Sequence, residues 1–168
     1  MNELVSILIP MFNREDLIQE TLKSALQQTY KNIEVIVVDN CSTDRSYSIV
    51  KEYQEKDPRI KLFKNEANLG PVRNWKRCIE HANGEYIKIL WSDDKISPQF
   101  IEKTLPILQK DQSIGFVYTK TIIFSEKTQF EFYRFGPTGK YKTSTFLFHT
   151  LIKENYVPVS PANALFRA

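Results

Sequence analysis

Residues 33–44 carry the pattern that decides the fold, Ile33-Glu34-Val35-Ile36-Val37-Val38-Asp39-Asn40-Cys41-Ser42-Thr43-Asp44. The first half of this stretch is almost continuously apolar and rich in β-branched side chains, which is typical of a strand covered on both faces of a sheet. The second half is small or polar and includes several helix-capping types, so we expect a loop and then a helix that extends to about Tyr53. A buried strand followed by a helix is the repeating unit of a parallel α/β sheet.

The same alternation of strand and helix continues on both sides of this segment. Helices are expected after Asn13, after the turn at residues 68–70 and from Ser97 onwards. Further strands are expected at residues 5–9, 60–63, 86–90 and 115–124. Because strand and helix alternate throughout, the sequence predicts the α/β class, with an open, mostly parallel sheet and helices on both faces.

Local signals predict where two of these helices begin and end. Asn13 is a favourable N-cap, and Glu15 and Asp16 would then lie in the first turn, where the helix dipole favours acidic groups. The apolar side chains between residues 18 and 26 recur at helical spacing and form one stripe. Pro106 lies inside the helix expected after Ser97, which predicts a bend or an early end.

The regular alternation stops after Phe124. Residues 131–141 mix aromatic and polar side chains around two glycines, which favours a hairpin or an irregular excursion. A short helix is expected over residues 144–153, and a last segment follows at residues 155–168. We therefore predict an α/β domain at residues 1–125 and a different region at residues 126–168.

Length, charge and cysteine content exclude several classes of protein. The 168 residues suffice for one ordinary domain, and 23 basic against 20 acidic residues give a net charge of +3 that is mixed along the chain. Such a weak charge does not indicate a nucleic-acid partner. The apolar residues 4–12 are too few to span a membrane and follow no cationic segment, so no signal peptide is predicted. Cys41 and Cys78 lack metal-type spacing, which favours free thiols in a cytoplasmic protein.

Polar side chains follow three of the predicted strands at the point where each strand ends. They are Phe12-Asn13-Arg14 after the first strand, Asp39-Asn40 after the second and Ser92-Asp93-Asp94 after the fourth. In open α/β sheets, ligands bind outside the carboxyl ends of the strands near a topological switch point. The sequence therefore predicts a binding site where these three segments meet.

Asp93 and Asp94 are the pair that points most directly to a ligand. Adjacent carboxylates repel each other unless a cation or hydrogen-bond donors neutralise them, and hard oxygen ligands favour Mg²⁺ or Mn²⁺. The alternative is that both residues only cap the following turn. Asp39 also has two interpretations. Its carboxylate would bind the base or the ribose of a nucleotide, or it would only accept hydrogen bonds from loop amides. Asp44 stands at a helix start and is expected to be a cap.

Other candidate motifs have ordinary structural explanations. The chain has no G-x-G-x-x-G or Walker pattern, which argues against dinucleotide and P-loop chemistry. His81 and His149 have no partner at metal-ligand spacing. The basic and aromatic residues 140–142 resemble a nucleic-acid or membrane-surface patch, but a solvated hairpin is the favoured explanation.

Taken in order, these segments resemble glycosyltransferase family 2, an inverting family with the nucleotide-diphospho-sugar transferase fold. The matching segments lie between about residues 4 and 125 and are residues 5–13, residues 28–44, Asn68-Leu69-Gly70, Arg73-Asn74, residues 82–87 and Ser92-Asp93-Asp94. The resemblance implies a Rossmann-like sheet of the glycosyltransferase A type. It also implies transfer of a sugar from a nucleotide-diphospho-sugar, with a UDP-sugar favoured, to a saccharide or other hydroxyl acceptor in polysaccharide biosynthesis.

The resemblance also implies roles for individual residues. Pro10 and Phe12 would line the nucleotide-binding pocket with Asn13, and the ring of Phe12 would stack on the base. Asp39 would accept a hydrogen bond from uracil or its equivalent, and Arg73 would contact the nucleotide. The remaining two residues would bind the metal: Asp93 would face the ribose or the metal, and Asp94 would be the main ligand of Mn²⁺ or Mg²⁺. That cation would act as a Lewis acid on the leaving group.

Two departures from the family pattern limit what the resemblance implies. Many relatives have an acidic residue where this chain has Trp91, which leaves less negative charge for the metal. Inversion needs a carboxylate base, but after Asp111 the chain has only Glu126, Glu131 and Glu154, none in the family's context. We therefore expect residues 1–125 to bind the nucleotide-sugar and residues 126–168 to be the truncated start of the acceptor side.

Three functional hypotheses follow. The favoured one is the donor-binding part of a longer glycosyltransferase, for which peripheral membrane association is also considered. The second is a non-catalytic nucleotide-sugar-binding module or an inactive fragment. The third is a sugar nucleotidyltransferase, which ranks last because residues 11–15 lack the glycine-rich, basic loop of that class.

Overall fold

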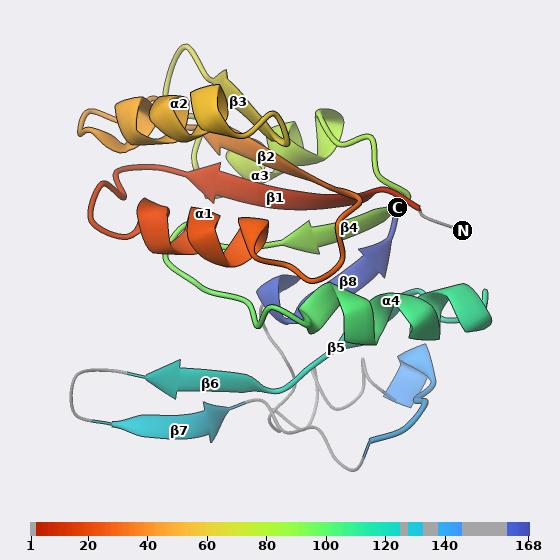
Figure 1. The fold of residues 1–168 in the computed structure, drawn as a ribbon. Helices are drawn as coiled ribbons and strands as arrows, with labels where there is room; N and C mark the ends of the chain where they lie inside the picture. The colour runs from red at the N-terminus through yellow and green to blue at the C-terminus, as the bar shows by residue number, and fades with distance from the viewer. Residues whose placement is uncertain (1–2, 125–127, 133–137, 146–160) are drawn as a thin grey trace. The chain divides into compact units, whose positions relative to one another are not determined.

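The computed structural model describes residues 3–124, 128–132, 138–145 and 161–168 (Figure 1). The chain divides into two compact units, one made of residues 1–117 and 165–168 and the other of residues 118–164. The first unit contains the parallel strands and the helices on which the predicted site depends. No helix among the described residues has both the length and the apolar character that crossing a membrane requires.

Four neighbouring parallel strands form one side of a six-stranded sheet. They are β1 (Val5–Met11), β2 (Ile33–Asp39), β3 (Ile60–Lys64) and β4 (Tyr86–Ile89). With β5 (Phe116–Tyr118) and β8 (Ala164–Arg167), the order across the sheet is β3-β2-β1-β4-β8-β5. Val5 pairs with Ile33 and Met11 with Asp39, so the carboxyl ends of β1 and β2 lie level. Every residue of β2 is buried, which explains its continuous apolar sequence.

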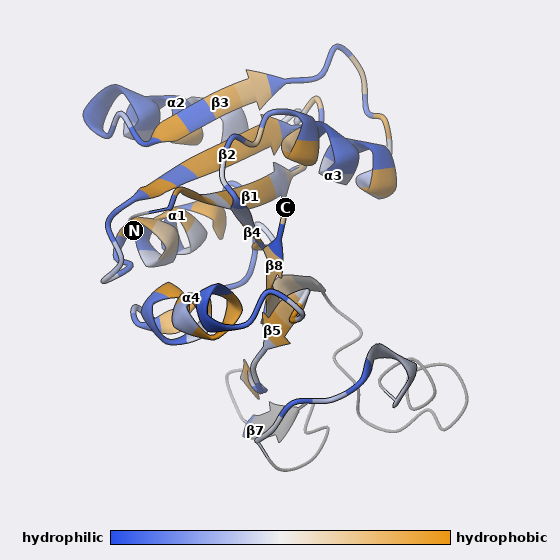
Figure 2. Cartoon of the chain, turned by 90° about the vertical axis from the view of Figure 1, so that its right-hand side faces the viewer, coloured by the Kyte–Doolittle hydropathy of each residue, from blue (hydrophilic) through white to orange (hydrophobic). Residues whose placement is uncertain are grey.

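Helices cover both faces of the sheet, as predicted. They are α1 (Ile18–Leu26), α2 (Ser46–Lys56), α3 (Pro71–Glu80) and α4 (Phe100–Lys110). Successive side chains of a strand point to opposite faces, so Ile7 and Ile9 pack with α1, α2 and α4, whereas Leu8 packs with α3. Figure 2 shows the apolar residues concentrated on the strands and on the helix sides that face them.

The predicted start of the first helix was wrong. Residues 15–17 form a turn and α1 begins only at Ile18, so the acidic residue in its first turn is Glu20. Asn13 does not cap a helix, because its backbone has a positive φ of 49° and its side-chain oxygen accepts a hydrogen bond from the backbone N–H of Thr43. A long-range contact thus replaces the local one that the sequence suggested.

Two further boundaries differ from the prediction. Helix α4 does not end at Pro106 but continues to Lys110, because Leu105 and Leu108 on its inner face are buried on either side of the proline. The single strand expected at residues 115–124 is two strands, β5 (Phe116–Tyr118) and β6 (Thr121–Phe124). Both halves of this run have strand-forming side chains, so local propensity contained no sign of the break between them.

The end of the chain forms a strand that the sequence pattern did not predict. Residues 161–163 form a short 3₁₀ turn, and β8 (Ala164–Arg167) follows and pairs antiparallel with β4. In the second unit, β6 pairs antiparallel with β7 (Gln129–Phe132). Residues 143–145 are helical, whereas the rest of the helix predicted at residues 144–153 lies outside the described residues.

Candidate functional site

The strand order places a topological switch point at the carboxyl ends of β1 and β4. From β1 the chain moves outward to β2 and β3, and then returns to the other side of β1 to form β4. The connections that leave β1 and β4 therefore lead to opposite ends of the strand order, and ligands are expected to bind at this edge of the sheet. The segments after these two strands contain Phe12-Asn13-Arg14 and Ser92-Asp93-Asp94, which were predicted to meet here.

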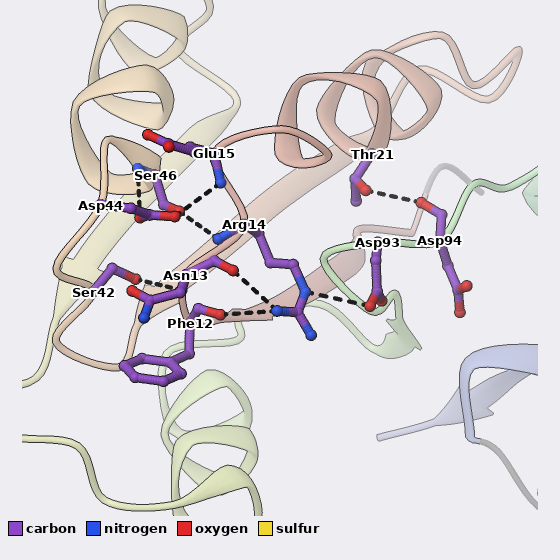
Figure 3. A network of polar contacts seen from close by, with 10 residues as sticks. All are labelled: Phe12, Asn13, Arg14, Glu15, Thr21, Ser42, Asp44, Ser46, Asp93 and Asp94. Carbon is purple, nitrogen blue, oxygen red and sulfur yellow. Dashed lines mark hydrogen bonds and ion pairs between the residues drawn. The ribbon is translucent and has the colours of Figure 1, made fainter.

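The loop after β1 is held by the segment that precedes α2 (Figure 3). The backbone N–H groups of Asn13 and Arg14 donate to the side-chain oxygens of Ser42 and Ser46, at 3.0 Å and 2.6 Å. Asp44 accepts from the backbone N–H of Ser46 at 2.9 Å and from that of Glu15 at 3.1 Å. These bonds fix the backbone from which Phe12 and Arg14 project. The cap predicted at Asp44 is not formed, because the N-cap position of α2 is Arg45 and α2 has no side-chain cap bond.

The nucleotide-binding residues predicted on this loop differ in exposure. Pro10 is half-buried within β1 and pairs with Val38 of β2. Phe12 is 39% exposed, which is high for an aromatic side chain and leaves a ring face available for stacking. In Figure 3 this ring points away from Arg14 and Asp93. The loop thus presents an aromatic group on one side and a cation on the other.

Asp39 ends β2 and is fully buried. Its carboxylate accepts hydrogen bonds from the backbone N–H of Ser42, at 3.2 Å to each oxygen, and from the Ser42 hydroxyl. Asp39 therefore satisfies loop amides in this structure. A carboxylate can accept about four hydrogen bonds, so capacity for a base remains, although the residue is not accessible to solvent in this structure.

An asparagine cluster joins the end of β2 to the start of α3. Asn65 donates to Asn40 at 3.0 Å and to Asn74 at 2.8 Å, while Asn40 donates to Asn68 at 2.7 Å. Asn40, Asn65 and Asn74 are buried, so these mutual bonds satisfy amides that would otherwise be costly to desolvate. The cluster thereby fixes the start of the helix from which Arg73 extends, exposed to solvent.

Asp93 and Asp94 follow β4 on the opposite side of the switch point. The Asp93 side chain is 41% exposed and pairs with Nε of Arg14 at 3.3 Å. The backbone carbonyl of Asp94 accepts from the Thr21 hydroxyl at 2.9 Å, which ties this segment to α1. Neither carboxylate accepts a backbone N–H from any residue that the structure describes, so the geometry does not support a role limited to capping a turn.

Burial and the neighbouring charge of Asp93 raise the pKa of Asp94 above its usual value. Burial is the largest cause, the negative charge of Asp93 adds to it, and the positive charge of Lys88 opposes it. Lys88 lies on β4 with its side chain fully buried and its amine 4.2 Å from the centroid of the Phe100 ring. Burial lowers the pKa of Lys88 to about 7, although the charge of Asp94 acts in the other direction. A lysine within an otherwise apolar strand pattern was the signal that could have identified this residue from the sequence.

The arrangement fits a divalent ion that takes part of its coordination from a ligand. Asp93 and Asp94 supply hard oxygen donors, and Figure 3 shows both side chains extending to the same side of their segment. The described residues contain no cluster of three or more His, Cys, Asp or Glu side chains. Trp91 occupies the position where an acidic residue was noted as missing and packs edge-on against Trp75, with ring centroids 5.8 Å apart. Two protein carboxylates suffice for Mg²⁺ or Mn²⁺ when phosphate oxygens and waters complete the coordination shell.

The structure brings some predicted residues together and leaves others undecided. Phe12, Asn13 and Asp93 lie around Arg14 at the switch point, and Arg14 itself was not predicted to bind a ligand. Its position directly after a strand end was the available signal. The candidate bases Glu126 and Glu154 lie outside the described residues, and the side chain of Glu131 is not described.

Sequence comparison relates the chain to known transferases. The profile described as Glycosyl transferase family 2 matches residues 6–168. An uncharacterized glycosyltransferase of Haemophilus influenzae is 38% identical over 111 residues, which are 66% of this chain and 44% of that protein. The putative teichuronic acid biosynthesis glycosyltransferase TuaG of Bacillus subtilis is 36% identical over 116 residues, which are 69% and 46% of the two chains. The chain thus spans about half the length of these curated relatives.

Solved structures agree with the sequence relatives. Staphylococcus aureus TarS 1-349 in complex with UDP-GlcNAc matches with a TM-score of 0.73 and 25% identity, over 97% of this chain and 45% of that one. The mannosyltransferase PcManGT from Pyrobaculum calidifontis in complex with GDP-Man and Mn²⁺ matches with a TM-score of 0.65 and 27% identity, over 70% and 35%. With the profile match over nearly its whole length, the chain belongs to glycosyltransferase family 2 and has the glycosyltransferase A-type fold.

Proposed function

We propose that the chain binds a nucleotide-diphospho-sugar, with a UDP-sugar favoured, as the donor side of an inverting, metal-assisted glycosyltransferase. One observation carries the proposal. The loops after β1 and β4 place an exposed aromatic ring, a guanidinium and two acidic side chains at the switch point of a parallel sheet. A nucleoside diphosphate has matching parts, because its base can stack, and its phosphates attract both a cation and a metal ion held by carboxylates.

The relatives support this assignment of donor. TarS is crystallised with UDP-GlcNAc, and PcManGT with GDP-Man and Mn²⁺, so proteins of the same fold bind both uridine and guanine nucleotide sugars. TuaG is named as a putative glycosyltransferase of teichuronic acid biosynthesis. This name supports a role of this chain in polysaccharide biosynthesis, with sugar transfer to a hydroxyl acceptor. We retain residues 1–125 as the proposed donor side and residues 126–168 as the start of the acceptor side.

The proposed roles of the residues follow from their positions. Phe12 stacks on the base, with Pro10 at the end of β1 and Asn13 in the following loop lining the same pocket. Arg73 reaches the nucleotide from the first turn of α3. Asp39 at the end of β2 accepts a hydrogen bond from the base.

At the other side of the switch point, Asp94 and Asp93 are the residues that would hold Mn²⁺ or Mg²⁺. In transfer with inversion, the acceptor oxygen bonds to the anomeric carbon as the bond from that carbon to the phosphate oxygen breaks. The departing diphosphate gains negative charge, which a bound divalent ion neutralises as a Lewis acid. The two carboxylates would hold this ion at the rim. Removal of the acceptor proton needs a separate base, which the described residues do not supply at this rim.

Titration calorimetry with UDP and GDP, in Mn²⁺ or in EDTA, tests the proposal. We expect UDP to bind more tightly than GDP and more tightly with Mn²⁺ than in EDTA. Asp94→Ala should remove the dependence on metal, whereas Asp39→Ala should weaken binding of UDP in both conditions. Asp16→Ala, an exposed residue on the nearby turn, is the matched control and should change neither. Binding that is indifferent to metal would contradict the metal site, and absence of binding to both nucleotides would refute the proposal.

A further inference from the structure

Arg14 joins the two sides of the switch point. Its Nε donates to Asp93 at 3.3 Å, and its Nη1 donates to the backbone carbonyls of Phe12 at 3.3 Å and Asn13 at 3.0 Å (Figure 3). The contact with Asp93 spans 79 positions of sequence and links the loop after β1 to the loop after β4. The guanidinium is therefore held between the segments that leave these two strands.

The Arg14 side chain is held in place but retains unused hydrogen-bond donors. The backbone of Arg14 is anchored by the hydrogen bond from its N–H to Ser46, which lies at the start of α2. A guanidinium has five N–H donors, and the three bonds above use one on Nε and two on Nη1. The two donors on Nη2 make no hydrogen bond to any residue that the structure describes, and the side chain is 40% exposed. A planar donor group with unused N–H groups thus faces solvent beside Asp93.

Stability does not explain this arrangement. Ion pairs between side chains as exposed as Arg14 and Asp93 contribute little to folding. The pair instead neutralises one of two adjacent carboxylates, which lowers the repulsion that an incoming phosphate would meet. Arginine also matches phosphate oxygens in geometry, since its planar fork can donate two parallel hydrogen bonds.

We propose that Arg14 is a donor-binding residue that contacts the diphosphate through Nη2. This inference rests on the proposed function, because it assumes that a nucleoside diphosphate occupies the switch point. Arg14 lies between Phe12, which would stack on the base, and Asp93, which would face the metal. The phosphates must pass between those two groups, and Arg14 is the cation that the structure places there.

The experiment compares UDP with uridine, which lacks the phosphates, in Mn²⁺ and in EDTA. Arg14→Gln removes the charge, and Arg14→Lys keeps the charge without the fork. Arg45→Gln is the matched control, because Arg45 also pairs with a carboxylate, that of Glu15 at 3.1 Å. Figure 3 shows Glu15 on the side of the loop away from Asp93. Thermal unfolding of each variant shows whether its fold is intact, and we expect unchanged midpoints because both ion pairs are exposed.

We expect Arg14→Gln to weaken UDP binding about ten- to hundredfold in both Mn²⁺ and EDTA, because the loss of hydrogen bonds to a charged group lowers affinity by about this factor. Uridine affinity should stay the same, Arg14→Lys should be intermediate, and Arg45→Gln should resemble the wild type. A loss confined to Mn²⁺ would overturn the inference, because Arg14 would then act only by orienting Asp93. An equal loss for uridine would overturn it as well, as an effect on the loop. If the wild-type chain binds no UDP, the proposed function itself has failed.

Discussion

Replacing Gly84 by alanine should destabilise the first unit, because no room exists for the added methyl group. A Cβ at Gly84 would lie 2.6 Å from the backbone N of Ser6, 2.7 Å from the Ser6 hydroxyl and 2.8 Å from the carbonyl oxygen of Leu4. Two of these three atoms are backbone atoms in or next to the central strand β1 and cannot rotate away. The Gly84 N–H also donates to the Ser6 hydroxyl at 2.8 Å, and that hydroxyl donates to the buried carboxylate of Glu34 at 2.6 Å.

The size of the effect follows from these contacts. Inserting a methyl group into a packed interior costs about 1–3 kcal/mol. Disturbing a hydrogen bond that supports a buried carboxylate adds about 1–3 kcal/mol. We therefore expect Gly84→Ala to lower the free energy of unfolding by about 2–6 kcal/mol. With an intermediate urea dependence of about 2 kcal/mol per molar, the unfolding midpoint should fall by about 1–3 M.

Urea unfolding followed by tryptophan fluorescence measures this effect, because Trp75 and Trp91 both lie in the first unit. Gly115→Ala is the matched control in the same unit, since a Cβ there meets no atom within 4 Å and its φ lies outside the left-handed region. The control should change the free energy of unfolding by no more than about 0.5 kcal/mol. Equal midpoints for the two variants would refute the packing argument.

Two further predictions concern titration and thiol reactivity. Burial would raise the pKa of Glu34, but hydrogen bonds led by that from Lys61 outweigh it and lower the pKa below the ordinary 4.5. The stability that Glu34 contributes is thus fully present above pH 4.5 and is lost as the pH falls through the lower folded-state pKa. The free energy of unfolding of Glu34→Gln should therefore fall less steeply with decreasing pH than that of the wild type. Equal slopes for the two proteins would contradict this prediction. Burial raises the pKa of the Cys78 thiol to about 12, whereas Cys41 is half-buried, so a disulfide reagent should label Cys41 first and Cys78 only on unfolding. Equal labelling rates in the native protein would count against a closed core around Cys78.

The parts of the fold that follow from local periodicity were predictable. The buried strands β1 and β2 have almost no polar side chains, and the inner faces of α1 and α4 repeat at helical spacing. Because a parallel sheet brings its carboxyl ends to one edge, strand positions alone also predicted that Asp39 and Asp93 would lie at the same rim. The resemblance to the family then implied roles for individual site residues, which the spacing of residues in the sequence does not indicate.

The parts that depend on distant partners were not predictable in this way. Asn13 has the local pattern of a helix cap, yet its side chain binds Thr43, 30 positions away. The last strand, β8, pairs with β4 in a register that places Arg167 opposite Tyr86. The short sequence of β8 has no pattern that predicts this pairing. Arg14 was predicted to lie at the end of the first strand, but only the structure places its guanidinium beside Asp93. In each case the deciding contact is made by a residue that the sequence pattern does not bring close.

The two edges of the sheet handle buried and crowded charge in opposite ways. At the amino edge, the Glu34 carboxylate accepts hydrogen bonds from Ser6, Lys61 and the backbone and side chain of Asn83, so its charge is neutralised within the protein. At the carboxyl edge, Asp93 is half-exposed and has one ion pair, and its charge raises the pKa of Asp94. A fold that satisfies one carboxylate so completely has no structural need to leave two others adjacent and under-compensated. Such an imbalance is expected where a ligand completes the interactions, which is the strongest physical reason to look for the donor and its metal at this edge.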